Sequence, residues 1–184
     1  MNFEQMTNTD IMLKEIDLIQ DCVKRMASNS FSAKRWNIAV IAACVTLAKQ
    51  QETFNGYIVA IVACLVFWWM DSYYLRIERM YRRKYEWVLQ NRLQSFAYAF
   101  DLNPANRAMW LAAESHGAGG TARSSVAFYA VQWSPTLRNC YLPIIIVLYF
   151  CLAASDSSLT LKGLIALVLS CLLSYGYCHR NDWE

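Results

Sequence analysis

Four apolar stretches, arranged in two pairs, dominate the pattern of hydrophobic and polar positions along this chain. A polar N-terminal segment precedes the first pair, and a basic segment separates the two pairs. A bilayer core of about 30 Å requires roughly 20 helical residues, so three of the stretches need part of their flanks to cross it. The stretches are Trp36–Ala48, Phe54–Tyr74, Cys140–Ala154 and Leu159–Tyr177.

This pattern predicts an all-α integral membrane protein with four transmembrane helices arranged as two hairpins. Hydrophobic residues make up 57% of the chain and charged residues 17%, which is too apolar for an ordinary soluble domain of 184 residues. The run Ile58–Trp69 has no polar face, unlike a helix on the surface of a soluble bundle. The predicted segments are a cytoplasmic N-terminal amphipathic helix (1–33), transmembrane hairpin 1 (34–74), a cytoplasmic helical region that continues the second transmembrane helix (75–138), transmembrane hairpin 2 (139–178) and a cytoplasmic tail (179–184).

The positive charges predict the orientation of these helices. Residues 1–35 carry five Lys and Arg, and residues 75–139 carry nine, whereas each short connection within a hairpin carries one. Because cytoplasmic segments carry an excess of Lys and Arg, both termini and the central segment are expected in the cytoplasm.

The N-terminal segment predicts an amphipathic helix that begins near Thr7–Asp10 and ends near Ala27. The stretch Ser28–Ser32 is expected to interrupt the helical structure before the first crossing. Apolar residues recur at steps of three and four, as on one face of a helix, and we expect this seam to pack on another cytoplasmic helix of the same or a neighbouring subunit. The seam consists of Met12, Ile16, Ile19, Val23 and Met26.

The second crossing is expected to continue into the cytoplasm as one helix of about 40 residues, since no Gly or Pro occurs between Asp71 and Leu93. Its cytoplasmic part is basic and aromatic. One interpretation is a collar of cations that binds anionic lipid; the other is a site for an anion or a nucleotide phosphate, with aromatic rings that stack on bases. The candidate residues are Arg76, Arg79, Arg82, Arg83, Lys84 and Trp87.

No enzyme, cofactor or metal site is expected. The apolar stretches contain no His and no paired carboxylates, and the seven cysteines include no CxxC pair. Two groups remain as candidates for a pore or gate. Ser170 and Ser174 could line a water path with Lys162 near its outer end, and Asp71 lies at the cytoplasmic end of the second crossing beside Trp68 and Trp69.

Asp71 has an alternative role, a salt bridge to Arg35 or Arg138 at the membrane interface. A four-helix subunit has no hole through it, so a pore would require a ring of identical subunits. An acidic side chain repeated around that ring would favour cations.

Two runs, Lys14–Trp36 and Val66–Val88, resemble the SLATT-like small membrane proteins of bacterial antiphage systems, in design closest to the Hailong channel subunit and to retron-associated or Kiwa membrane components. The resemblance implies a homo-oligomeric effector in the bacterial inner membrane. It also implies a nucleotide or oligonucleotide ligand made by a neighbouring nucleotidyltransferase, or a cytoplasmic protein partner. This chain differs from the two-crossing SLATT minimum by its second hairpin.

Together, the residues and the resemblance favour an ion channel or pore-forming effector that acts in abortive infection by depolarising the membrane and is gated at its cytoplasmic face. The alternative is a sensor or anchor that does not conduct ions and recruits a cytoplasmic defence protein.

Overall fold

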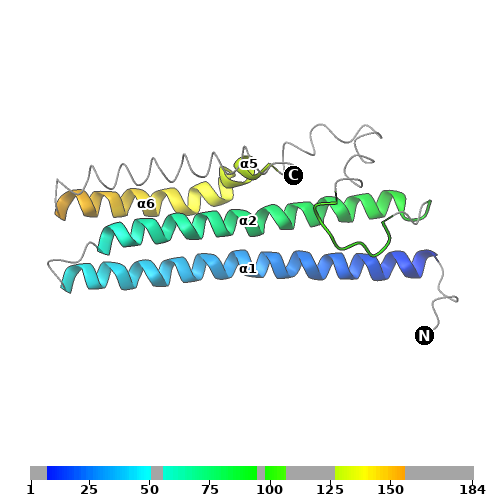
Figure 1. The fold of residues 1–184 in the computed structure, drawn as a ribbon, viewed down its shortest axis with the longest axis horizontal. Coiled ribbons are helices and arrows are strands. Elements are labelled where there is room, and N and C mark those ends of the chain that lie inside the picture. The colour runs from blue at the N-terminus through cyan, green and yellow to red at the C-terminus, as the bar shows by residue number, and fades with distance from the viewer. Residues whose placement is uncertain (1–7, 51–55, 95–97, 107–126, 156–184) are drawn as a thin grey trace. The chain divides into compact units, whose positions relative to one another are not determined.

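The computed structural model describes residues 8–50, 56–94, 98–106 and 127–155 (Figure 1). The described regular elements are all α-helices. They are α1 (Asn8–Gln50), α2 (Gly56–Asn91), α5 (Phe128–Gln132) and α6 (Pro135–Ser155).

Helix α1 is continuous over 43 residues, so the predicted break at Ser28–Ser32 is wrong. Serine costs only about half a kcal/mol relative to alanine inside a helix, and α1 contains no Gly or Pro that would end it. Ser30 is buried, and its hydroxyl donates a hydrogen bond to the Asp71 carboxylate. A tertiary contact thus occupies the hydroxyl that was expected to favour a turn.

Helix α2 confirms the prediction that the second crossing continues as one helix. It spans 36 residues, or about 54 Å at 1.5 Å per residue, and it ends at Asn91. The same helix therefore contains the apolar run Ile58–Trp69 and the basic residues that follow Asp71.

The chain divides into two compact units, and α1 and α2 contribute to both. Unit 1 contains Met1–Ser28 and Tyr74–Val126, and unit 2 contains Asn29–Tyr73 and Ala127–Glu184.

Unit 1 has a core in which the predicted seam of α1 packs on α2 of the same chain. Ile16 and Ile19 are buried with Cys22 against Tyr81 and Val88. Three partly buried seam residues, Met12, Val23 and Met26, pack around them. The seam thus packs in a core that it shares with a helix of the same chain.

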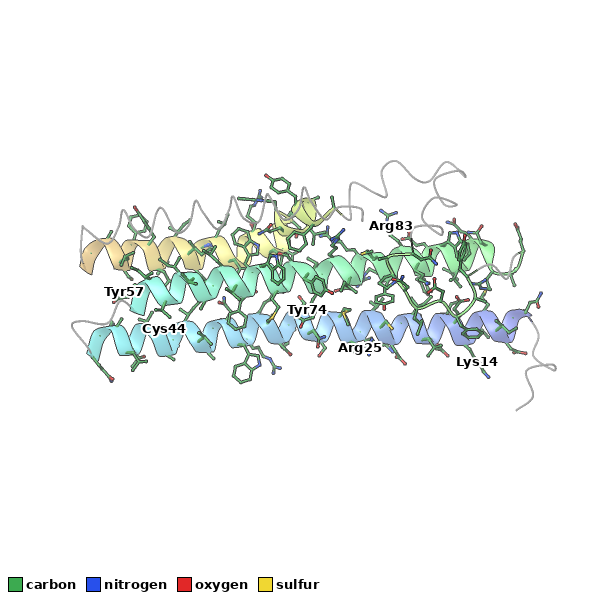
Figure 2. All side chains as sticks on the ribbon, in the orientation of Figure 1. Lys14, Arg25, Cys44, Tyr57, Tyr74 and Arg83 are labelled. Carbon is green, nitrogen blue, oxygen red and sulfur yellow. The ribbon has the colours of Figure 1, made fainter. Side chains whose placement is uncertain are left out.

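Unit 2 has an apolar cluster in its core, formed by side chains of its helices. Ala60 and Ile61 of α2 are buried against Leu148 and Leu152 of α6. Partly buried residues of α1 and α2, among them Cys44 and Tyr57, pack around this cluster (Figure 2).

Two helices in the described part of the chain, α2 and α6, are long and apolar enough to cross a membrane. Helix α6 contains the third predicted stretch, Cys140–Ala154. The first stretch, Trp36–Ala48, forms the C-terminal part of α1, which is not one of these two helices. The fourth, Leu159–Tyr177, lies outside the described residues.

Candidate functional site: a buried charged junction in unit 2

Asp71 of α2 is the centre of a buried polar junction in unit 2. Its side chain is fully buried. It accepts hydrogen bonds from two hydroxyl groups and forms an ion pair with one lysine. Ser30 Oγ donates to Oδ1 at 2.5 Å, while Lys34 Nζ lies 2.6 Å from Oδ2. The hydroxyl of Tyr141, from α6, donates to Oδ2 at 3.0 Å. One carboxylate therefore links α2 to α1 and to α6.

The spacing of residues on α1 explains why its side of the junction is polar. Ser30, Lys34 and Asn37 are separated by four and three positions, which places them on one face of a helix. Lys34 also donates to Ser30 Oγ at 2.9 Å. From Ile41 onward the partly buried residues of this face are apolar, so the polar contacts occupy one end of the unit 2 part of α1.

Aromatic rings border the carboxylate. Trp68 precedes Asp71 by three positions on α2 and is buried; its Nε1–H donates to the backbone oxygen of Gln132 at 3.1 Å. The Trp68 ring stacks on Tyr141, with centroids 6.0 Å apart and planes 3° apart, and meets Trp133 edge-on at 5.7 Å. These contacts fix Tyr141, the third donor to Asp71, against α2.

Because the Lys34–Asp71 pair is largely buried, removing one partner affects stability differently from removing both. Loss of one partner would leave the other charge buried and uncompensated, which typically costs about 3–5 kcal/mol, whereas replacement of both by apolar residues is often neutral. The pair therefore contributes more to how the helices are aligned than to the net stability of the fold.

Two further buried polar atoms of unit 2 have no hydrogen-bond partner among the described residues. They are Asn37 Oδ1 and Ser134 Oγ. The Asn37 amide nitrogen donates to Cys64 Sγ at 3.8 Å, a weak contact. A buried acceptor left without a hydrogen bond costs about 1–3 kcal/mol, so this arrangement carries a local penalty at Asn37.

The predicted gate residues that the structure describes differ in their burial and in their contacts. Asp71 pairs with Lys34, not with the predicted alternatives Arg35 and Arg138, both of which are exposed. Trp69 is 39% exposed and contacts Tyr73 and Phe128. The remaining candidates, Ser170, Ser174 and Lys162, lie outside the described residues.

The basic candidates of α2 have different contacts. Arg82 donates from Nε and Nη2 to Glu78 Oε1, and Arg83 pairs with Glu86 at 3.5 Å. Lys84 is buried and lies 3.8 Å from Asp101. Two others, Arg76 and Arg79, are half-buried on α2, and Trp87 contacts Tyr98 and Arg92.

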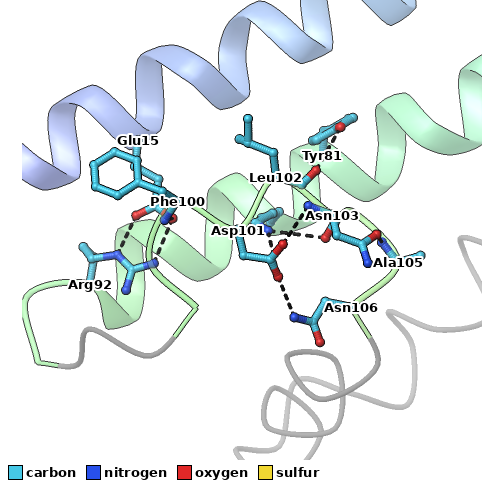
Figure 3. Close-up of polar contacts among 10 residues, drawn as sticks. Glu15, Tyr81, Arg92, Phe100, Asp101, Leu102, Asn103, Ala105 and Asn106 are labelled. Atoms are coloured by element: carbon cyan, nitrogen blue, oxygen red, sulfur yellow. Dashed lines mark hydrogen bonds and ion pairs between the residues drawn. The ribbon is translucent and has the colours of Figure 1, made fainter.

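A second buried ion pair, in unit 1, was not predicted. Arg92 donates from Nε and Nη2 to the two carboxylate oxygens of Glu15, at 2.6 and 2.8 Å, and neither side chain is exposed (Figure 3). The backbone N–H of Phe100 donates to the same carboxylate at 3.3 Å. The available signal was Glu15 itself, an acid beside Ile16 and four positions before Ile19 on the apolar seam.

The segment 98–106 is attached to α2 by polar contacts (Figure 3). Tyr81 donates from its hydroxyl to the backbone oxygen of Leu102 at 3.1 Å, and Lys84 donates to that of Asn103 at 3.3 Å. Tyr98 and Phe100 have φ angles of 59° and 56°, which are unfavourable for residues with a Cβ. These contacts hold the segment in a conformation that its own backbone preferences disfavour.

Two pKa shifts accompany these contacts in unit 1. Burial lowers the pKa of the Lys84 ammonium, although Asp101 and Glu15 oppose this effect. Partial burial by itself raises the pKa of the Asp101 carboxyl, but hydrogen bonds from the Asn106 side chain and the Asn103 backbone, together with Lys84, bring that pKa below its usual value.

The two buried ion pairs, Lys34–Asp71 and Glu15–Arg92, can fix how the helices that they join are aligned. In the described part of the chain, no group of three or more His, Cys, Asp or Glu side chains could hold a metal ion. Comparisons with protein-family models, curated proteins and solved structures found no match to this chain.

Proposed function

We propose that this chain forms an oligomeric ion channel or pore in the bacterial inner membrane, as an effector of antiphage defence that is gated at its cytoplasmic face. In this proposal both termini are cytoplasmic, unit 2 contains the membrane-spanning segments, and unit 1 receives the signal. The signal is a nucleotide, an oligonucleotide or a protein partner.

One observation carries the proposal: α2 runs without interruption from the apolar run Ile58–Trp69 into the basic segment after Asp71. A continuous helix transmits a displacement along its axis, because its backbone hydrogen bonds resist bending. A force applied near Arg82 or Lys84 is therefore delivered to Asp71, where α1 and α6 are attached.

The conduction path would form between subunits. The polar groups of the junction, Ser30, Lys34 and Asp71, make their contacts inside one subunit, so they do not provide a path through it. An axial pore in a ring of subunits would use side chains outside this set, and Ser170 and Ser174 remain the candidates for it.

A second function, an anchor that does not conduct ions, is favoured by the outer faces of the described apolar helices. Many large apolar side chains of unit 2 are exposed, among them Ile38, Val66, Val147 and Phe150. Such faces suit contact with lipid, whereas the wall of an aqueous path requires polar groups. Under this alternative, unit 1 recruits a cytoplasmic protein.

Ion currents across a planar bilayer that contains the purified full-length chain test the proposal. Currents would be recorded under voltage ramps, alone and with ATP or a DNA 20-mer on the side that unit 1 faces. Unitary currents in any of these conditions support a channel. Their absence in all three, from protein that elutes as a stable oligomer or monomer, would overturn the proposal in favour of the anchor.

A further inference from the structure

We propose that the Lys34–Asp71 pair is a latch: while the pair is formed, the junction of α1, α2 and α6 excludes water, and release of Lys34 opens it. The inference deepens the proposed function and rests on it, because the latched arrangement is taken to be the non-conducting one. It is carried by the contacts, by the unequal burial of the two partners and by the Asn37 oxygen, which has no hydrogen-bond partner among the described residues.

Asp71 makes direct polar contacts with both neighbouring helices, α1 and α6. Ser30 and Lys34 attach α1 to it, and Tyr141 attaches α6. The apolar cluster around Ile61 and Leu148 forms another part of the described core of unit 2, and its contacts have no preferred direction and tolerate small shifts. The polar contacts of Asp71 are directional, so the ion pair aligns α1 with α2 and the Tyr141 hydrogen bond aligns α6 with them.

Unequal burial determines how the pair can separate. The Asp71 side chain is fully buried, whereas that of Lys34 is 23% exposed. A lysine side chain is long and flexible, so its ammonium can move out to water or to a lipid phosphate. Asp71 cannot follow, since it lies inside the unit on a continuous helix. Once Lys34 leaves, the buried carboxylate lacks a counter-ion, so it must bind a proton or be solvated by water that enters the junction.

Asn37 favours the open arrangement of the junction. It lies on the same face of α1 as Lys34, three positions further on, and is 1% exposed. Its Oδ1 has no hydrogen-bond partner among the described residues. Water that enters the junction can donate to this oxygen, so opening removes a penalty that the latched arrangement carries. The penalty at Asn37 thus offsets part of the cost of breaking the ion pair.

Cys64 is a natural reporter for the opening. It is fully buried, and its Sγ accepts the contact from Asn37 Nδ2. The full-length chain in lipid nanodiscs would be treated with a positively charged methanethiosulfonate reagent, which reacts only where water reaches the thiol. Mass spectrometry of peptides would then give the rate of modification at Cys64 separately from the other cysteines.

The variants separate a latch from a pair that only supports the fold. We expect Lys34→Met and Asp71→Asn to raise the rate at Cys64 by about tenfold or more, since each breaks the pair. The double variant Lys34→Met/Asp71→Met should return to a rate at or below that of the wild type. Arg35→Met, an exposed neighbour of the pair on α1, is the matched control and should leave the rate unchanged.

A milder variant covers the case in which a single charge deletion does not fold. Tyr141→Phe removes one hydrogen bond to Asp71 and keeps the ring that stacks on Trp68. It should raise the Cys64 rate by a smaller factor than Asp71→Asn does. Rates that stay at the wild-type value in folded Lys34→Met and Tyr141→Phe would overturn the latch.

Bilayer currents distinguish failure of the latch from failure of the proposed function. Currents in the wild type that are identical in Asp71→Asn and Lys34→Met overturn the latch alone. Faster Cys64 modification in the single variants with no current from any variant supports the opening of the junction and overturns the channel.

Discussion

Arg92 and Glu15 form an ion pair although 77 positions separate them, and neither side chain is exposed. Arg92 donates from two nitrogens to both carboxylate oxygens and lies 5.5 Å from the centroid of the Trp87 ring. Because the pair joins α1 to the turn after α2, it fixes the alignment of these two segments within unit 1.

Removal of one partner of this pair should destabilise unit 1 far more than removal of both. We expect Arg92→Met to lower the free energy of unfolding by about 3–5 kcal/mol, since Glu15 would keep a buried charge, and Glu15→Met/Arg92→Met to recover most of that loss. Thermal unfolding in detergent, followed by circular dichroism, measures both. The control is Lys24→Met, whose pair with Asp21 has side chains that are 72% and 74% exposed, with an expected change of about 0–1 kcal/mol. A similar loss in Arg92→Met and Lys24→Met would contradict this account.

Ile19 should be a main contributor to the core of unit 1. It is fully buried between Ile16, Cys22 and the residues of α2, so Ile19→Ala should lower the free energy of unfolding by about 2–5 kcal/mol. Leu18, its neighbour in sequence, is 42% exposed, and Leu18→Ala is the matched control with an expected change within about 0.5 kcal/mol. Urea titration in micelles would compare the two. The seam would be misplaced if Leu18→Ala proved the more damaging change.

Asp101 should make unit 1 sensitive to acid. Its pKa in the folded chain is below the ordinary value of 3.8, so its stabilising contribution is complete above that value. The contribution is lost as the pH falls through the lowered pKa, because the unfolded chain then binds more protons than the folded chain. Urea midpoints measured between pH 7 and pH 2.5 should fall less steeply for Asp101→Asn than for the wild type. Parallel curves would show that the carboxyl gains nothing from Lys84, Asn103 and Asn106.

Helix α6 should lose its ability to enter a membrane when a charge is placed on its exposed apolar face. Val147 is 60% exposed, and lysine at the centre of a transmembrane helix costs about 2.5–3.5 kcal/mol for insertion. Val147→Lys should therefore reduce the fraction of chain that resists alkaline carbonate extraction from membranes. Asn139→Lys, at an exposed polar position near the start of α6, should behave like the wild type. Equal retention of both variants would count against α6 as a membrane span.

The sequence predicted the helical class, the amphipathic seam and the length of α2, because all three follow from local periodicity. Met12, Ile16 and Ile19 recur at helical spacing whatever they contact, and the absence of Gly and Pro after Asp71 allows one helix. The break at Ser28–Ser32 was wrong because local preference at Ser30 is weaker than its buried hydrogen bond to Asp71.

Only the tertiary structure decided which charges meet. Spacing could not show that Asp71 pairs with Lys34 and not with Arg35 or Arg138, since all three cations lie near the same predicted membrane boundary. The same holds for Glu15 and Arg92, and for the separation of Arg82, Arg83 and Lys84 onto different partners. A hydrophobic period records which face of a helix is buried, but a charge pair depends on the rotation and axial alignment of two helices. Those are set only when the helices pack.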